Sequence, residues 1–96
     1  MLERYINGNS GTVMIAIDDC PYSDRAGSAL SSIGASYRRI NIDSYSKPQV
    51  KNELYQRVGA STFPQIFVNG QHFGDCSKVQ QHLNNGTLGN ALNNFF

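Results

Sequence analysis

Cysteine is scarce in this sequence of 96 residues, which contains only Cys20 and Cys76. Two cysteines so far apart are too few for a disulfide framework, and they lack the paired spacing of a zinc site. An excess of one charge is also missing, because eight basic and seven acidic residues leave a net charge of +1. The basic residues are scattered, which argues against nucleic acid or an anionic membrane surface as a partner. No apolar run approaches the roughly 18 residues of a membrane-spanning helix.

The composition suits a folded protein, since 40% of the residues are hydrophobic, enough for a packed core. The length predicts one domain over residues 1–96. The first residues mix Glu3 and Arg4 with Leu2, Tyr5 and Ile6, which is not typical of a secretory signal. We therefore expect a small cytoplasmic domain with no membrane attachment and no nucleic-acid partner.

Hydrophobic spacing predicts helices and strands that alternate along the chain. Leu2, Tyr5 and Ile6 fall on one face of a short helix, which the glycine-rich segment 8–11 would end. The apolar run 13–17 fits a buried helix or a strand, but its branched residues and the following Asp18-Asp19 favour a strand covered on both faces. Further helices are expected over residues 21–33, 46–58, around 79–83 and over 88–95, and further strands over 37–42, 65–68 and 71–73.

Local signals indicate how these elements begin and turn. Pro21 suits a first helical turn, Ser46 and Gln49 predict a capping box, and Asn69-Gly70 is typical of a tight hairpin turn. The second strand is less apolar than the first, which places it near an edge. The order of elements predicts a right-handed parallel βαβ crossover followed by an antiparallel hairpin. The expected fold class is α/β, with a four-stranded mixed sheet covered by helices on both faces.

Cys20 lies where the first strand ends and the helix opened by Pro21 begins. Free backbone N–H groups and the positive end of the helix dipole are concentrated there, and both favour a thiolate. A free cysteine is also commonly a small buried residue, so the residue type alone assigns no function. The Cys-Pro pair at a strand-to-helix junction favours a reactive thiol.

Three segments in this order, Cys20-Pro21-Tyr22-Ser23, Thr62-Phe63-Pro64-Gln65-Ile66-Phe67-Val68 and Gly74-Asp75-Cys76-Ser77, resemble the glutaredoxin family of the thioredoxin-like fold. The resemblance runs from about residue 12 to residue 88, most of the chain. Each segment alone is a weak signal, whereas the ordered set on a matching β-α-β-α-β-β-α frame is specific.

The resemblance implies a role for each matching residue. Cys20 would be the nucleophile, and the other implied roles all concern glutathione. Tyr22 would flank the glutathione site, and Phe63, before a cis Pro64, would offer its backbone N–H and C=O to the cysteinyl part. Cys76 and Ser77 would hold the γ-glutamyl carboxylate through their N–H groups, and Lys51 would meet the glycyl carboxylate. A helix start suits such a carboxylate. Lys51 could equally be a solvated surface lysine, and Cys76 could be a back-up resolving thiol or only a buried residue of the binding turn.

The sequence departs from the family pattern around the nucleophile and at the carboxylate turn. Ser23 stands where dithiol members have a second cysteine, so no disulfide can close within this motif. Ile17 replaces a frequent lysine, and Asp18-Asp19 place acid beside the thiol, an effect that Arg25 would partly offset. Phe63 replaces a usual valine, and Lys78 stands where an acidic contact to the substrate ammonium is expected.

The function implied by the resemblance is glutathione-dependent thiol–disulfide exchange. Glutathione would be the co-substrate, and glutathionylated proteins or small mixed disulfides would be reduced by a monothiol route that needs only Cys20. The alternative is a dimer in which Cys20 and glutathione from each subunit hold a [2Fe–2S] cluster; otherwise a monomer is expected. A third reading is an inert adaptor with the same fold. His72 and His82 lack partners at ligand spacing, so no other metal site is expected.

Overall fold

A computed structural model describes residues 1–7 and 11–95 of the chain. The elements follow in the order α1 (Leu2–Asn7), β1 (Thr12–Ala16), α2 (Pro21–Ser32), β2 (Tyr37–Asn41), α3 (Lys47–Val58), β3 (Gln65–Val68), β4 (Gln71–Asp75), α4 (Cys76–Asn84) and α5 (Leu88–Asn93). The expected stop of the first helix over residues 8–10 and the packing of Phe96 lie outside the described residues. In the described part of the chain, no helix has the length and apolar character needed to cross a bilayer.

The four strands form one mixed sheet in the order β2-β1-β3-β4. β1 runs parallel to β2, with Thr12 opposite Tyr37 and Ile15 opposite Ile40. β3 is antiparallel to both β1 and β4. The predicted parallel crossover, the hairpin and the edge position of β2 are therefore confirmed.

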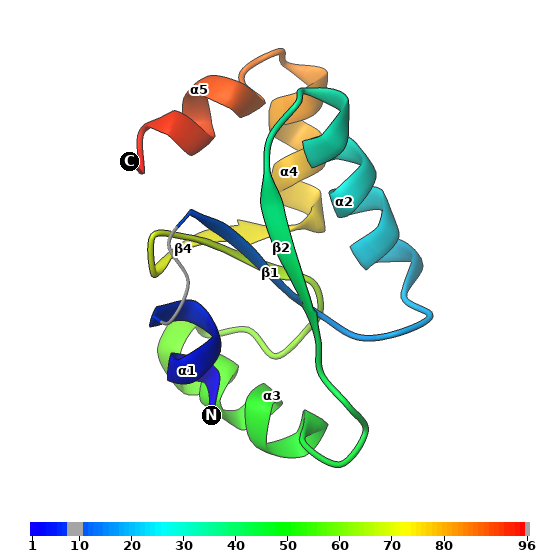
Figure 1. Ribbon diagram of the computed structural model, residues 1–96, viewed down its shortest axis with the longest axis vertical. Helices are drawn as coiled ribbons and strands as arrows, with labels where there is room; N and C mark the ends of the chain where they lie inside the picture. Colours follow the sequence, from blue (N-terminus) through cyan, green and yellow to red (C-terminus); the bar gives the residue numbers. More distant parts are fainter. Residues whose placement is uncertain (8–10, 96) are drawn as a thin grey trace.

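β1 lies in the centre of the sheet, and its residues are buried on both faces. Met14 and Ala16 point into a core formed with α2, α4 and α5. Val13 and Ile15 point into a second core formed with α1 and α3. Figure 1 shows the sheet between these two groups of helices. An unbroken apolar run is what a strand with two covered faces requires, so the predicted thioredoxin-like architecture follows from β1.

The β3–β4 hairpin turns at Asn69 and Gly70, whose φ angles are 50° and 81°. Positive φ at both central residues is the twist that a tight hairpin needs, and Asn-Gly adopts it at low cost. β4 continues to Asp75, two residues beyond the predicted strand. Because α4 follows without a connecting loop, Cys76 is its first residue.

The capping box predicted for α3 is wrong. Ser46 precedes the helix but has helical dihedral angles, φ −84° and ψ −15°, and its side chain makes no capping hydrogen bond. A capping side chain needs an extended backbone to reach back to the helix. Here Asp43 has already started the turn, because its carboxylate accepts a hydrogen bond from Ser46 N at 2.7 Å and its carbonyl accepts one from Lys47 N at 3.0 Å.

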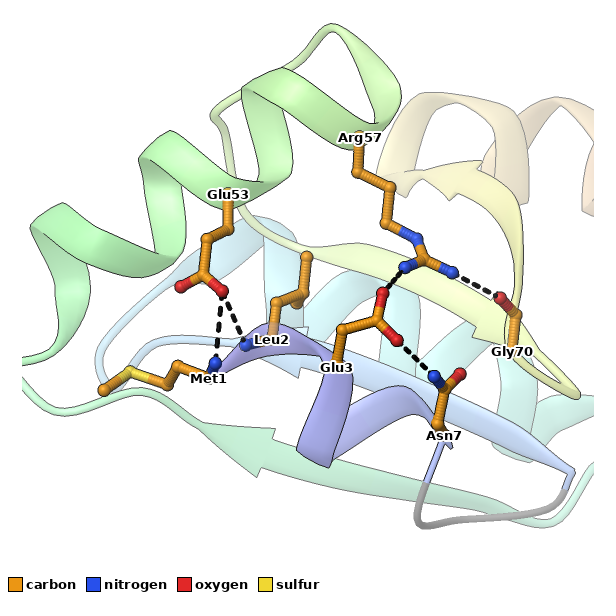
Figure 2. Close-up of polar contacts among 7 residues, drawn as sticks. All are labelled: Met1, Leu2, Glu3, Asn7, Glu53, Arg57 and Gly70. Carbon is orange, nitrogen blue, oxygen red and sulfur yellow. Dashed lines mark hydrogen bonds and ion pairs between the residues drawn. The ribbon is translucent and has the colours of Figure 1, made fainter.

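Polar contacts fasten α1 to α3 and to the hairpin (Figure 2). Glu53 of α3 accepts a hydrogen bond from Leu2 N at 3.3 Å. Arg57 forms an ion pair with Glu3 of α1 and donates to the carbonyl of Gly70 at 3.2 Å. α3 therefore connects the first helix to the hairpin turn, and this layer supports the face of the sheet opposite α2.

Gly27 and Gly89 offer a matched test of how closely α2 packs on the sheet. A Cβ at Gly27 would lie 2.6 Å from the hydroxyl oxygen of Tyr37, whereas a Cβ at Gly89 in α5 would meet nothing within 4 Å. Alanine in an open helical position should raise the free energy of unfolding by about 0.5–1 kcal/mol. We therefore expect Gly89→Ala to stabilise the protein and Gly27→Ala to destabilise it by about 1–3 kcal/mol, because the rigid Tyr37 ring must move. Urea unfolding of both variants measures this; equal stabilisation of the two would contradict the close packing of α2.

Candidate functional site

Cys20 occupies the junction between the central strand and α2. Asp18 and Asp19 form the turn after β1, and Asp19 has a φ of 55°, a left-handed conformation that aspartate tolerates better than most residues. Cys20 is the N-cap of α2, with φ −108° and ψ 108°, and Pro21 follows as expected for a first helical turn. The first helical hydrogen bond runs from Asp24 N to Cys20 O at 3.1 Å. The Cys20 side chain is therefore held at the free N–H groups of the helix.

The loop before β3 meets Cys20 from the other side. The sulfur of Cys20 lies 4.0 Å from the carbonyl oxygen of Phe63. The bond between Phe63 and Pro64 is cis, as the family resemblance implied. The Phe63 side chain packs against the α1–α3 core, so its backbone is left facing the thiol. Two segments that lie far apart in the sequence thus form one site.

The pKa of the Cys20 thiol lies below its ordinary value. Partial burial acts in the opposite direction and would raise the pKa. The Ser23 hydroxyl, the backbone N–H groups of Ser23 and Tyr22, and the positive charge of Arg39 together outweigh this effect. Since the thiolate is the nucleophile, this environment favours reactivity at neutral pH.

Ser23 is the first of these groups that the sequence pattern did not assign to the thiolate. Its side chain is fully buried, and among the described residues its hydroxyl finds no partner with hydrogen-bond geometry. A buried hydroxyl without a partner is costly. A thiolate on Cys20, one helical turn earlier, gives this hydroxyl an acceptor, so ionisation of Cys20 relieves the cost.

Arg39 of β2 is the second such group. Its guanidinium donates to the carbonyl of Ile17 at 3.1 Å and pairs with Asp24 at 2.8 Å. The sequence pattern pointed to Arg25 as the compensating charge, but the charge of Arg25 acts on Cys76. The signal that could have identified Arg39 is the parallel pairing of β1 with β2, which sets Arg39 beside Met14 in the middle of the central strand.

A pocket of about 460 Å³ lies between the start of α2 and the start of α4. It is lined by Tyr22, Arg25, Cys76, Ser77 and Gln80. The Arg25 guanidinium lies 5.6 Å from the centre of the Tyr22 ring, and Gln80 donates to the Arg25 carbonyl at 3.4 Å. The pocket combines a cation with the N-terminus of a nine-residue helix, an arrangement that suits an anion.

The structure bears on the two alternatives that the sequence left open for Cys76 and on the position of Lys78. Burial raises the pKa of the Cys76 thiol, which favours its role as a buried residue of the turn over that of a second reactive thiol. The Lys78 ammonium lies 5.2 Å from the centre of the Phe73 ring, and Lys78 is not among the residues that line the pocket. The side chain of Asp75 caps α4 by accepting a hydrogen bond from Lys78 N at 3.1 Å.

Lys51 is the one predicted site residue that no contact connects to the others. It lies on the exposed side of α3, and within the described residues no hydrogen bond or ion pair holds it. The structure therefore brings Tyr22, Cys76 and Ser77 together in the pocket and sets Phe63 against Cys20.

Residues 1–7 and 11–95 contain no group of three or more His, Cys, Asp or Glu side chains that could hold a metal ion. An iron–sulfur cluster needs four ligands, usually thiolates. At this site the chain offers Cys20 alone, because Cys76 is buried and its raised pKa disfavours the thiolate. The residues present would therefore fit a cluster only if three ligands came from outside the chain.

Comparisons with known proteins agree with this geometry. The glutaredoxin family model matches residues 12–73. Glutaredoxin 3 of Escherichia coli K12 is 41% identical over 62 residues, which are 65% of this chain and 72% of that protein. A dithiolic glutaredoxin from Trypanosoma brucei brucei is 30% identical in structural alignment, with a TM-score of 0.78 and coverage of 96% of this chain and 95% of that chain.

A buckwheat glutaredoxin–glutathione complex superimposes with a TM-score of 0.82 at 26% identity, covering 98% of this chain and 86% of that chain. The match to the family model covers well over half of this chain and includes both the Cys20 junction and the cis-proline loop. The chain belongs to the glutaredoxin family.

Proposed function

We propose that this glutaredoxin is a glutathione-dependent oxidoreductase that reduces glutathione mixed disulfides by a monothiol route. The observation that carries the proposal is the position of Cys20, a thiol of lowered pKa that faces the Phe63 carbonyl and has a buried hydroxyl, not a thiol, one turn further along α2. The substrates would be glutathionylated proteins or small mixed disulfides, and the protein would act as a monomer in the cytoplasm.

The route has two exchange steps. The Cys20 thiolate attacks the glutathionyl sulfur of the mixed disulfide, so a Cys20–glutathione disulfide forms and the substrate leaves as a thiolate that takes up a proton. A second glutathione thiolate then attacks the glutathionyl sulfur on Cys20. Glutathione disulfide is released and the Cys20 thiolate returns. In the net exchange, the second glutathione replaces the substrate thiol in the disulfide and Cys20 is regenerated, so no second protein thiol is required.

Two parts of the site support glutathione as the co-substrate. The backbone of Phe63 beside Cys20 would bind the cysteinyl part of glutathione. The N–H groups of Cys76 and Ser77 at the start of α4 would hold the γ-glutamyl carboxylate, beside the Tyr22 wall of the pocket. Lys51 is proposed for the glycyl carboxylate on family resemblance alone. A buckwheat glutaredoxin of similar structure was solved as a complex with glutathione, which supports glutathione as the ligand.

A cluster-binding dimer is the alternative, and the chain supplies it with one ligand. Cys20 would be the only protein thiolate per subunit, and glutathione would have to complete the set. Anaerobic reconstitution with iron and sulfide, followed by a visible absorption scan and size-exclusion chromatography, tests this separately. A coloured dimer that depends on Cys20 and glutathione would favour the cluster function.

The proposed function predicts that reduction of a glutathionylated peptide depends on Cys20. Wild-type protein with excess glutathione should release the peptide thiol, and mass spectrometry should detect a Cys20–glutathione intermediate. Cys20→Ser should abolish both, because a serine hydroxyl cannot exchange with a disulfide. Circular dichroism confirms that the variant is folded. Activity that survives in Cys20→Ser, or wild-type protein that forms no adduct, would contradict the proposal.

A second prediction concerns the effect of the Ser23 hydroxyl on the pKa of Cys20. Ser23→Ala should raise the pKa of Cys20, because the thiolate loses a buried hydrogen-bond donor. Ser28→Ala, an exposed change on the same helix, is the control and should leave the pKa unchanged. Iodoacetamide alkylation of Cys20 followed against pH measures both; the same midpoint for both variants would remove Ser23 from the thiolate environment.

Ser23→Cys tests the monothiol route itself. The new thiol lies one helical turn from Cys20, close enough for a disulfide, so the variant should gain reduction of protein disulfides that carry no glutathione. Reduction of the glutathionylated peptide should persist, since that route needs only Cys20. If wild-type protein already reduces the glutathione-free disulfide at the rate of the variant, the monothiol assignment is wrong.

A further inference from the structure

The side chain of Arg39 is fixed at three points around the end of the central strand. Its Nε donates to the side chain of Asn41 at 2.8 Å, its Nη1 to Asp24 at 2.8 Å, and its Nη2 to the carbonyl of Ile17 at 3.1 Å. These partners belong to β2, to the first turn of α2 and to the connection after β1. A planar guanidinium with five N–H donors can serve three acceptors at once, and lysine cannot reproduce that geometry.

Two of these partners enclose the nucleophile. Ile17 precedes the turn that leads to Cys20, and Asp24 follows Cys20 in the first turn of α2. The Ile17 carbonyl lies beyond the last residue of β1, where the sheet no longer supplies it with a partner. Since a buried or half-buried carbonyl needs a donor, Arg39 satisfies this group and ties both ends of segment 17–24 to the neighbouring strand.

We propose that Arg39 is a positioning residue for the Cys20 thiolate, because its guanidinium fastens both ends of the nucleophile segment to β2 and keeps a fixed positive charge near the sulfur. The catalytic part of this inference rests on the proposed oxidoreductase function, whereas the effect on the thiol does not.

Among the charged groups near Cys20, Arg39 is the one whose charge acts on the thiol, and its effect adds to those of the Ser23 hydroxyl and the backbone N–H groups. Asp18 and Asp19 are exposed in the preceding turn and bear negative charge, and the Ile17 side chain packs into the α1–α3 core without any charge. On α2, Asp24 is 67% exposed and pairs with Arg39, which is 26% exposed. Arg25 lies over the Tyr22 ring in the pocket, and its positive charge acts on the pKa of Cys76, the first residue of α4. Arg39 is thus the cation whose field lowers the pKa of Cys20.

Arg38 provides the matched control. It is the neighbour of Arg39 on β2, but it lines a separate pocket with Arg4 and Tyr5 on the side of α1. Arg38→Gln and Arg39→Gln therefore remove the same charge from the same strand on opposite faces of the sheet. Thermal unfolding of both variants establishes that they are folded under the conditions of the assay.

The experiment follows alkylation of Cys20 by iodoacetamide against pH, with mass spectrometry to separate Cys20 from Cys76. Arg39→Gln should move the midpoint to higher pH by about half a unit, which is about a threefold lower thiolate fraction below the midpoint. At high pH its rate should equal or slightly exceed that of wild type, because a thiolate of higher pKa is more nucleophilic. Arg38→Gln should superimpose on wild type.

Arg39→Lys adds a test that does not depend on whether the protein accommodates glutamine at position 39. It keeps the charge but loses the three-point contact, so its midpoint should fall between those of wild type and Arg39→Gln. Coincident alkylation curves for wild type, Arg39→Gln and Arg39→Lys would overturn the proposal. So would an alkylation rate that Arg39→Gln lowers by the same factor at every pH. Failure of the oxidoreductase function is distinguishable, because it would abolish reduction of the glutathionylated peptide in wild type and leave the alkylation profiles as predicted.

Discussion

The complete burial of β1 is the constraint on which the functional site depends. A central strand with cores on both faces cannot shift by one residue along its axis, because every side chain would then move to the opposite core. Its end at Ala16 is therefore fixed, and the chain must reach α2 within a few residues. The left-handed Asp19 makes this sharp turn and delivers Cys20 to the first free N–H groups of the helix. The position of Cys20 is thus a consequence of the packing of β1.

Sequence patterns predicted the features that depend on neighbouring residues. The apolar run of β1, the Asn69-Gly70 turn and the Cys20-Pro21 junction each carry their signal within a few positions, and the structure has all three. The capping box at Ser46 failed although its signal was also local, because the turn begun by Asp43 had already given Ser46 a helical backbone.

The residues that the sequence missed depend on registers and packing directions. Arg39 reaches the nucleophile segment only because β2 pairs in parallel with β1 and turns this side chain towards Asp24. Lys78 stands at the position of an expected substrate contact, yet its ammonium lies over the ring of Phe73, which is the extra residue of β4 opposite the Ile66–Phe67 step. The spacing of residues along the sequence cannot predict where these two side chains point, because each direction depends on how two elements pack against each other.

The two cysteines show that a helix start alone does not make a reactive thiol. Cys20 and Cys76 both lie at the N-terminal end of a helix, but the pKa of Cys20 is lowered and that of Cys76 is raised. At Cys76 burial dominates, and the cap residue Asp75 takes the N–H of Lys78 and adds a negative charge. At Cys20 burial is outweighed by the Ser23 hydroxyl, by backbone N–H groups and by Arg39. A positive charge acts on both thiols, Arg39 on Cys20 and Arg25 on Cys76, so what separates them is whether hydrogen bonds from a hydroxyl and from backbone N–H groups outweigh the effect of burial.

A site with one such thiol must leave it open to a second molecule. In a monothiol exchange the adduct on Cys20 is resolved from outside, so the sulfur has to stay accessible after the first step. Cys20 is only half-buried, and the adjoining Tyr22 is 59% exposed beside the pocket at the start of α4. Serine at position 23 fits the same requirement, because its buried hydroxyl can support the thiolate but cannot attack the adduct. Under the proposed monothiol route, the accessibility of Cys20 and the absence of a thiol at position 23 meet the same requirement, because glutathione would perform the step that a second cysteine would otherwise perform.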